Sequence, residues 1–240
     1  MHERLRSETT FMLTLATCVA VLPVAGLAVA AFTLLSYLGG PLPDLLYFAL
    51  QVGIGAVLSF AAMNHLLNPT RPIGMETLGQ ASLSAVKTFL GLSLLLAILL
   101  RLGGVLAGLF IEALGEEAGW SVRMMLRFGL PALFVAALGT ILPASVDDGD
   151  TSVRAALARH TAAPVFWRMM IVFTAMAAVG TAVLLTLAPA VAGKDEQGSV
   201  AIAILAVATG TVLAVGTVAI AAILTRAYAG AFAKGVRREP

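Results

Sequence analysis

The chain has 240 residues, of which 60% are hydrophobic and 12% charged, and its mean hydropathy is +0.97. Soluble domains average about 45–50% apolar and about 25% charged residues, so this composition excludes an ordinary water-soluble domain and a disordered chain. The 15 Lys and Arg are nearly balanced by 13 Asp and Glu, which argues against a nucleic-acid-binding protein. One cysteine, Cys18, cannot form an intrachain disulfide or a multi-cysteine metal site. We therefore expect an integral membrane protein.

Six apolar segments are long enough to cross a membrane as helices, since a hydrocarbon core of about 30 Å needs about 20 residues. Their continuous apolar character argues against a transmembrane barrel, whose strands alternate. The loops are short, so consecutive helices should be antiparallel neighbours. The prediction is an all-α polytopic protein of three hairpins in one membrane domain, 1–240, with Pro23 bending the first helix. The expected spans are 11–38, 45–67, 88–114, 120–142, 165–187 and 200–227.

The distribution of lysine and arginine predicts the orientation. Cytoplasmic loops carry an excess of these residues, and here eleven lie on one side of the six spans against three on the other. Both termini should therefore be cytoplasmic. The eleven are Arg4, Arg6, Arg71, Lys87, Arg154, Arg159, Arg168, Arg226, Lys234, Arg237 and Arg238.

Two loops on this basic side are each expected to form a short interfacial helix, at 75–85 and 151–161. In the second, Asp150 or Thr151 is a suitable N-cap, and Val153, Ala156 and Leu157 share a stripe at helical spacing. Basic side chains beside such a helix attract anionic headgroups, at about 1 kcal/mol each. The helices are either connectors resting on the bilayer or elements that recognise lipid. We mark Arg154, Arg159 and Arg168 as candidate contacts with lipid or a partner.

The order of interfacial helices and spanning pairs resembles the YciC-like bacterial inner-membrane proteins and the membrane domain fused to some glycerophosphodiester phosphodiesterases. The similarity rests on residues 79–85 (GQASLSA), on 152–157 (SVRAAL), and on Pro131 and Pro143, twelve residues apart around the fourth span. It covers roughly residues 75 to 230. It implies a six-helix bacterial inner-membrane protein with an envelope or lipid-related role. It supplies no catalytic residues, and nothing similar to the phosphodiesterase catalytic domain is present.

Arg101 is the clearest ionisable residue inside a span, and such residues are costly in hydrocarbon. It lies thirteen residues before Leu114, or roughly 20 Å along a helix. We therefore expect its guanidinium to face the protein interior. Candidate acceptors there are carbonyls near Gly103 and Gly104, hydroxyls on other helices, a water or a lipid phosphate; Arg101 is thus also a candidate contact with lipid or a partner. The hydroxyls considered are those of Ser59, Thr174 and Thr209.

At the opposite end of the helices, Glu112, Arg123 and Arg127 form a predicted cluster. It is either an interfacial ion pair closing the hairpin or a functional site.

Small residues that favour close helix packing in lipid recur at two places. Gly104 and Gly108 form a GxxxG pair, and Gly210 lies midway between Ala206 and Ala214 on the sixth span. These faces serve either internal packing or the docking of another subunit.

No nucleophile-elbow, phosphate-loop or zinc motif occurs. Asp147, Asp148 and Asp150 could bind a divalent cation, although capping and solvation explain them more simply. We therefore expect no catalytic residue, metal or cofactor. The leading hypothesis is a non-enzymatic inner-membrane protein, acting in envelope or lipid homeostasis or as an accessory subunit, with membrane lipids and other subunits as partners. The alternatives are a small transporter or channel using a helix break near Arg101, Gly103 and Gly104, and an intramembrane enzyme.

Overall fold

The computed structural model describes residues 9–38, 43–68, 83–115, 119–147, 151–159, 162–191 and 196–232. Helix accounts for 93% of these residues, and none of them is in a strand. Five helices are long and apolar enough to cross a membrane, and a bent pair makes a sixth span if it is counted as one. The prediction of an all-α polytopic protein is therefore confirmed.

The first predicted span is broken into two helices, α2 (Thr10–Ala20) and α3 (Leu22–Leu38), at an angle of 88°. Pro23 explains the break, because it has no N–H to donate and its ring clashes with the carbonyl four residues earlier. The expected bend is confirmed, but the span is not one continuous helix. α3 alone has 17 residues, or roughly 26 Å, which nearly matches a hydrocarbon core. The side chain of Thr9 caps α2 by accepting from the Met12 N–H at 3.3 Å.

The second and third spans are α4 (Asp44–Leu67) and α6 (Leu83–Leu114). They pack where the rings of Phe60 and Phe89 meet edge to face, with centroids 5.2 Å apart. α6 begins five residues before the predicted start at residue 88. Most of the interfacial helix expected at 75–85 lies outside the described residues, and its last three residues belong to α6.

The fourth span consists of α7 (Trp120–Leu138) and α8 (Ile141–Val146), separated by Gly139 and Thr140. Pro143 lies inside α8 rather than after the span, so the helix runs four residues past the predicted end at residue 142. The short helix α9 (Val153–Ala158) follows, within the expected interfacial segment. Its N-cap is Ser152, whose hydroxyl accepts from the Ala155 N–H at 3.1 Å, and not Asp150 or Thr151.

The last hairpin is α10 (Ala162–Val191) and α11 (Glu196–Phe232), which pack along each other. α11 is the central helix of the fold, because α2, α3, α4, α8 and α10 all pack against it. Its close approach to α3 is made at Gly210, where an added Cβ would lie 2.9 Å from the Val29 carbonyl oxygen. Ala206 and Ala214, one turn away on either side, are buried as well.

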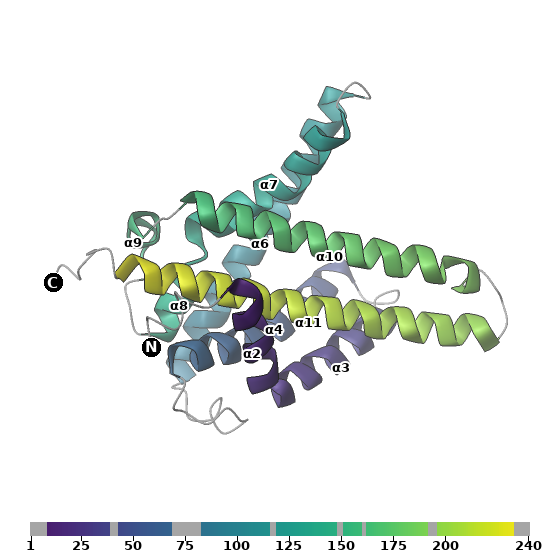
Figure 1. Cartoon of the computed structure of the whole chain (residues 1–240), viewed down its shortest axis with the longest axis horizontal. Helices are drawn as coiled ribbons and strands as arrows, with labels where there is room; N and C mark the ends of the chain where they lie inside the picture. Colours follow the sequence, from purple (N-terminus) through teal and green to yellow (C-terminus); the bar gives the residue numbers. More distant parts are fainter. Residues whose placement is uncertain are drawn as a thin grey trace.

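The core lies toward one end of the bundle. On α4 the buried residues run from Ala56 to Leu67, and on α11 most residues from Ala214 to Ala231 are buried. Toward the other end the hairpins diverge, and the tip of α6 and α7 points away from α10 and α11 (Figure 1). Many large apolar side chains of these diverging arms are exposed, which suits contact with lipid. They include Leu45, Leu109, Trp120, Met125, Leu185 and Ile204.

Candidate functional site at the arginine-bearing end

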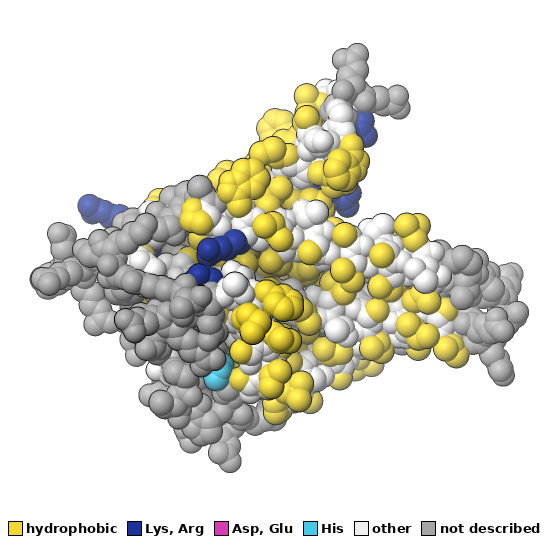
Figure 2. All heavy atoms as spheres, in the orientation of Figure 1, with side chains coloured by type: hydrophobic (Ala, Val, Ile, Leu, Met, Phe, Trp, Pro, Cys, Tyr) yellow, Lys and Arg dark blue, Asp and Glu magenta, His cyan; other side chains and the backbone are white. Residues whose placement is uncertain are grey.

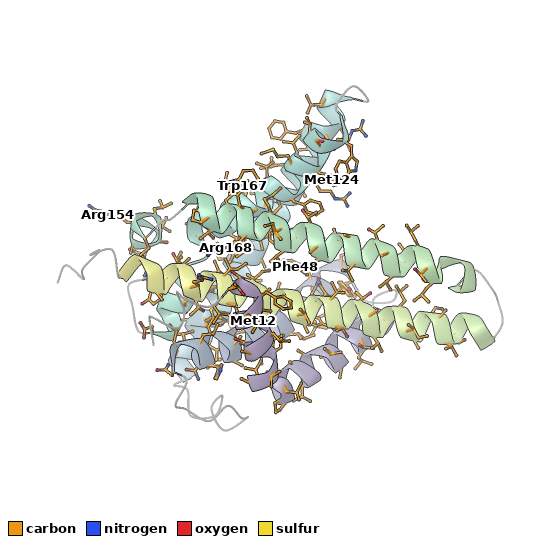
Figure 3. The ribbon with its side chains drawn as sticks, viewed as in Figure 1. Met12, Phe48, Met124, Arg154, Trp167 and Arg168 are labelled. Atoms are coloured by element: carbon orange, nitrogen blue, oxygen red, sulfur yellow. The ribbon has the colours of Figure 1, made fainter. Side chains whose placement is uncertain are left out.

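Four arginines from three consecutive elements gather near the end of the bundle where the core lies. Arg154 is on α9, Arg159 directly follows it, Arg168 is on α10 and Arg226 is on α11. Dark blue side chains of the arginine class appear over this end of α10 and α11 beside an apolar patch (Figure 2). Arg154 and Arg168 are labelled in Figure 3, on α9 and on the first turns of α10. We call this the arginine-bearing end.

The antiparallel register of α10 and α11 brings Arg168 and Arg226 to the same level. Met176 packs on Gly216, where a Cβ would overlap the methionine sulfur. Arg168 is eight residues before Met176, and Arg226 is ten residues after Gly216. At 1.5 Å per residue, the two Cα positions are within about 3 Å of each other along the axis. The guanidinium groups lie close enough to repel each other, and both side chains are half-buried.

Helix α2 covers α11 beside Arg226. Leu13 of α2 forms a buried cluster with Leu66, Ala222 and Ala229. Positions 222, 226 and 229 share one face of α11, since residues four and seven apart align on a helix. Arg226 therefore lies on the same face of α11 as Ala222 and Ala229, which belong to the buried cluster with Leu13 of α2. Next to Leu13 on α2, Phe11 and Met12 expose 73% and 54% of their surface. Helix α2 therefore presents exposed apolar side chains at the arginine-bearing end.

Arg159 is held inside the protein. Its side chain is only 6% exposed, and its guanidinium carbon lies 5.3 Å from the ring centroid of Tyr228 on α11. The Tyr228 hydroxyl donates to an Asp147 carboxyl oxygen at 3.1 Å. Asp147 ends α8 and Arg159 ends α9, so the two ends of the connecting segment are both fastened to one fully buried tyrosine. In this position Arg159 is not accessible to lipid, in contrast to our expectation for it.

Asp147 thus accepts a hydrogen bond from Tyr228, whereas the sequence alone allowed it to be a ligand of a divalent cation. Asp148 and Asp150 lie outside the described residues. No cluster of three potential metal ligands occurs in the part of the chain that the structure describes.

Arg154 and α9 lie at the surface, as an interfacial helix requires. Arg154 is exposed, as are Val153 at 53% and Leu157 at 50%. Ala156 is buried, and Val153 also lines a small crevice with leucines of α6 and residues of α7 and α8. Helix α9 is therefore seated on the bundle by one alanine face and presents two apolar side chains and one arginine outward.

The prediction that the Arg101 guanidinium faces the protein interior is wrong. The side chain is exposed, and its guanidinium carbon lies 4.9 Å from the ring centroid of Phe48. Phe48 is only four residues into α4, or roughly 6 Å from the start of that helix. Arg101 is therefore level with the N-terminal end of the shorter helix α4, although it lies midway along the longer helix α6. The position along α6 alone therefore does not place Arg101 relative to α4.

The helix break that the transporter hypothesis required is absent. α6 is continuous from Leu83 to Leu114, through both glycines. Gly103 instead serves packing: a Cβ there would lie 3.1 Å from the Phe134 ring and 3.3 Å from the Pro131 nitrogen of α7.

The remaining predicted residues are the glycines expected to pack helices and the charged cluster at the tip of α6 and α7. Among the residues that the structure describes, nothing lies within 4 Å of a Cβ built at Gly104 or Gly108, so this GxxxG face is open there, whereas Gly210 is in close contact with α3. At the tip of α6 and α7, Glu112 and Arg127 are exposed. There the Arg123 guanidinium donates to the Gly115 carbonyl at 3.0 Å. This bond closes the hairpin with a backbone acceptor, and the ion pair expected for the cluster stays a prediction.

Sequence reasoning left Arg226 and Tyr228 out of the candidate site. Arg226 entered only as a positive charge in the orientation count, because its level relative to Arg168 depends on how α10 and α11 pair. Tyr228 gave no signal, since a tyrosine near the end of a span fits the interfacial belt equally well. A comparison with protein families, curated proteins and solved structures found no match to the chain.

Proposed function

We propose that this chain is a non-enzymatic inner-membrane protein acting in lipid homeostasis of the bacterial envelope, with its arginine-bearing end in contact with anionic lipids of the cytoplasmic leaflet. One observation carries the proposal: arginines of α9, α10 and α11 gather at one end, beside the exposed Phe11 and Met12 of α2. Basic side chains at a membrane surface attract anionic headgroups. Apolar side chains beside them can contact the acyl chains of the same lipids.

The orientation in this proposal rests on the lysine and arginine count. A reporter active only in the cytoplasm should give a signal when fused after Pro240, and none when inserted near Gly193. The opposite pattern would place the arginine-bearing end outside and contradict the assignment to the cytoplasmic leaflet.

The lipid preference can be measured on the full chain in nanodiscs. We expect a higher melting temperature in bilayers that mix phosphatidylglycerol with phosphatidylcholine than in phosphatidylcholine alone, because a ligand that binds only the folded state stabilises it. Deleting the gene should shift the ratio of anionic to zwitterionic phospholipid in the producing cells. Equal melting temperatures in both bilayers together with an unchanged cellular ratio would refute the proposal.

A second candidate, an accessory subunit of a membrane complex, is favoured by the open face at Gly104 and Gly108 on the diverging α6 and α7 arm. Faces of small residues let helices approach closely in lipid. Crosslinking from position 104 in intact membranes distinguishes the two: a discrete adduct with another membrane protein supports the subunit, and adducts with lipid alone support the first proposal.

A further inference from the structure

We infer that Arg168 of α10 and Arg226 of α11 form a two-arginine site for a phosphate group, which in the membrane is the headgroup phosphate of a phospholipid. This inference rests on the proposed function and names the ligand chemistry and the residues. Arg154, Arg159 and Arg101 are not part of the site.

The geometry of the two helices supports this pairing. The Met176 contact with Gly216 fixes the register and places both arginines at one level. On α10, Val165 and Met169 are buried, and Arg168 lies at the edge of this stripe, three residues after one and next to the other. On α11, Arg226 shares a helix face with Ala222 and Ala229, which form a buried cluster with Leu13 of α2. Both arginines therefore lie beside packed residues of their helices, and both side chains are half-buried rather than freely solvated.

The depth of the pair matches a headgroup. Arg168 is four residues inside the apolar stretch Pro164–Leu187, and Arg226 is five residues from the end of Ser199–Ala231. These separations correspond to roughly 6–8 Å, a distance that an arginine side chain can cover by extending toward the interface. Trp167 of α10 is 55% exposed, and tryptophan is enriched at this level of a membrane.

The electrostatics favour an anion between the two groups. Their mutual repulsion is one of the interactions that Arg226 experiences, and partial burial weakens its screening by water. A phosphate accepts hydrogen bonds from two guanidinium groups at once, and the planar arginine fork suits this bidentate geometry better than lysine does. A phosphate at this level could therefore bridge the two guanidinium groups. Figure 3 shows Met12 and Arg168 on the same face of the molecule, where α2 offers apolar surface for an acyl chain.

The test uses the full chain and two phosphate sources. Native mass spectrometry after extraction from nanodiscs of phosphatidylglycerol and phosphatidylcholine measures retained lipid. Calorimetric titration of delipidated protein with inorganic phosphate measures the free anion. We expect the double variant Arg168→Gln/Arg226→Gln to lose about tenfold or more in retained phosphatidylglycerol, as for a charge-assisted bidentate contact. The matched control Arg127→Gln removes an exposed arginine at the opposite tip of α6 and α7 and should change retention less than twofold.

The double variant Arg168→Lys/Arg226→Lys keeps both charges and tests whether lipid is lost because the site is changed or because the protein misfolds. It should elute from gel filtration like the wild type and retain an intermediate amount of lipid. If the wild type retains more phosphatidylglycerol than the glutamine double variant, the lipid is the source of the phosphate. If the two proteins differ only in the heat released on titration with inorganic phosphate, the site binds a soluble anion instead. The second outcome would leave the site in place while the proposed function fails. Binding of both probes that is unchanged in the glutamine double variant would overturn the inference.

Discussion

Replacing Gly210 by leucine should separate α11 from α3 and destabilise the protein by about 1–3 kcal/mol or more, as for overpacked cores. A Cβ at this position would lie 2.8 Å from the Thr33 hydroxyl and 2.9 Å from the Val29 carbonyl oxygen. These two atoms are themselves hydrogen-bonded at 2.8 Å, so neither can move independently of the helix. The gain in helix propensity from glycine to leucine is below about 1 kcal/mol and does not offset the clash.

Gly104→Leu is the matched control for this experiment. The substitution is chemically identical, but none of the described residues lies within 4 Å of the added Cβ, so only the propensity gain remains. Unfolding in detergent, followed by helical circular dichroism, measures both variants against the wild type. Equal loss of stability in the two variants would show that the contact between α3 and α11 is not the cause.

Comparison of these two glycines shows how far the sequence alone could lead. Both occur in small-residue patterns that favour close packing, and the sequence treated them alike. Only the pairing of helices distinguishes them: Gly210 is on the central helix α11, whereas Gly104 is on the outward face of the α6 and α7 arm. The spans themselves were predictable, because an apolar run of about 20 residues has few other structures in a membrane protein.

The depth of ionisable groups was harder to predict. For Arg101, the distance along α6 gives the depth only if all helices share one length and tilt. α6 has 32 residues and α4 has 24, so the middle of the longer helix lies beside the first turns of the shorter one. The contact with Phe48 records this offset. Arg168 and Arg226 posed the same problem, because their common level depends on the register between helices rather than on position within either one.

The bend at Pro23 was predictable because it has a local cause. Its consequence, that α2 packs against α11, depends on the buried cluster that Leu13 forms with Leu66, Ala222 and Ala229. A long-range contact of this kind has no signal in a single apolar sequence, where most positions offer similar side chains.

Replacing Tyr228 by alanine should cost about 3–5 kcal/mol, the range for removing a large aromatic ring from a packed core. Tyr228 is fully buried, and it packs with Leu67 and Ala144 in one apolar cluster. The substitution would also remove the hydrogen bond to Asp147 and the ring beneath Arg159. The expected result is a lower unfolding midpoint and release of the segment that joins α8 to α10, detected as faster proteolysis between residues 147 and 162.

Tyr228→Phe separates the contributions, because it keeps the ring and loses only the hydroxyl. Its expected cost is about 1–3 kcal/mol, since a carboxyl acceptor is left without this donor. Arg159 still has its aromatic neighbour in this variant, and cation–π contacts contribute about 0.5–2 kcal/mol depending on exposure. A further substitution, Arg159→Gln, should therefore cost more in the phenylalanine background than in the alanine background.

This difference in the cost of Arg159→Gln is the coupling between ring and guanidinium, and a double-mutant cycle measures it directly. Equal costs of Arg159→Gln in the two backgrounds would mean that the arginine is held by other contacts and that Tyr228 fastens only the Asp147 end of the segment. A measurable coupling would instead show that both ends of the segment depend on the same tyrosine. In that case α11 positions the segment that carries α9 and Arg154. Because α11 also carries Arg226, the exposed arginine and the inferred phosphate site would both depend on the same helix.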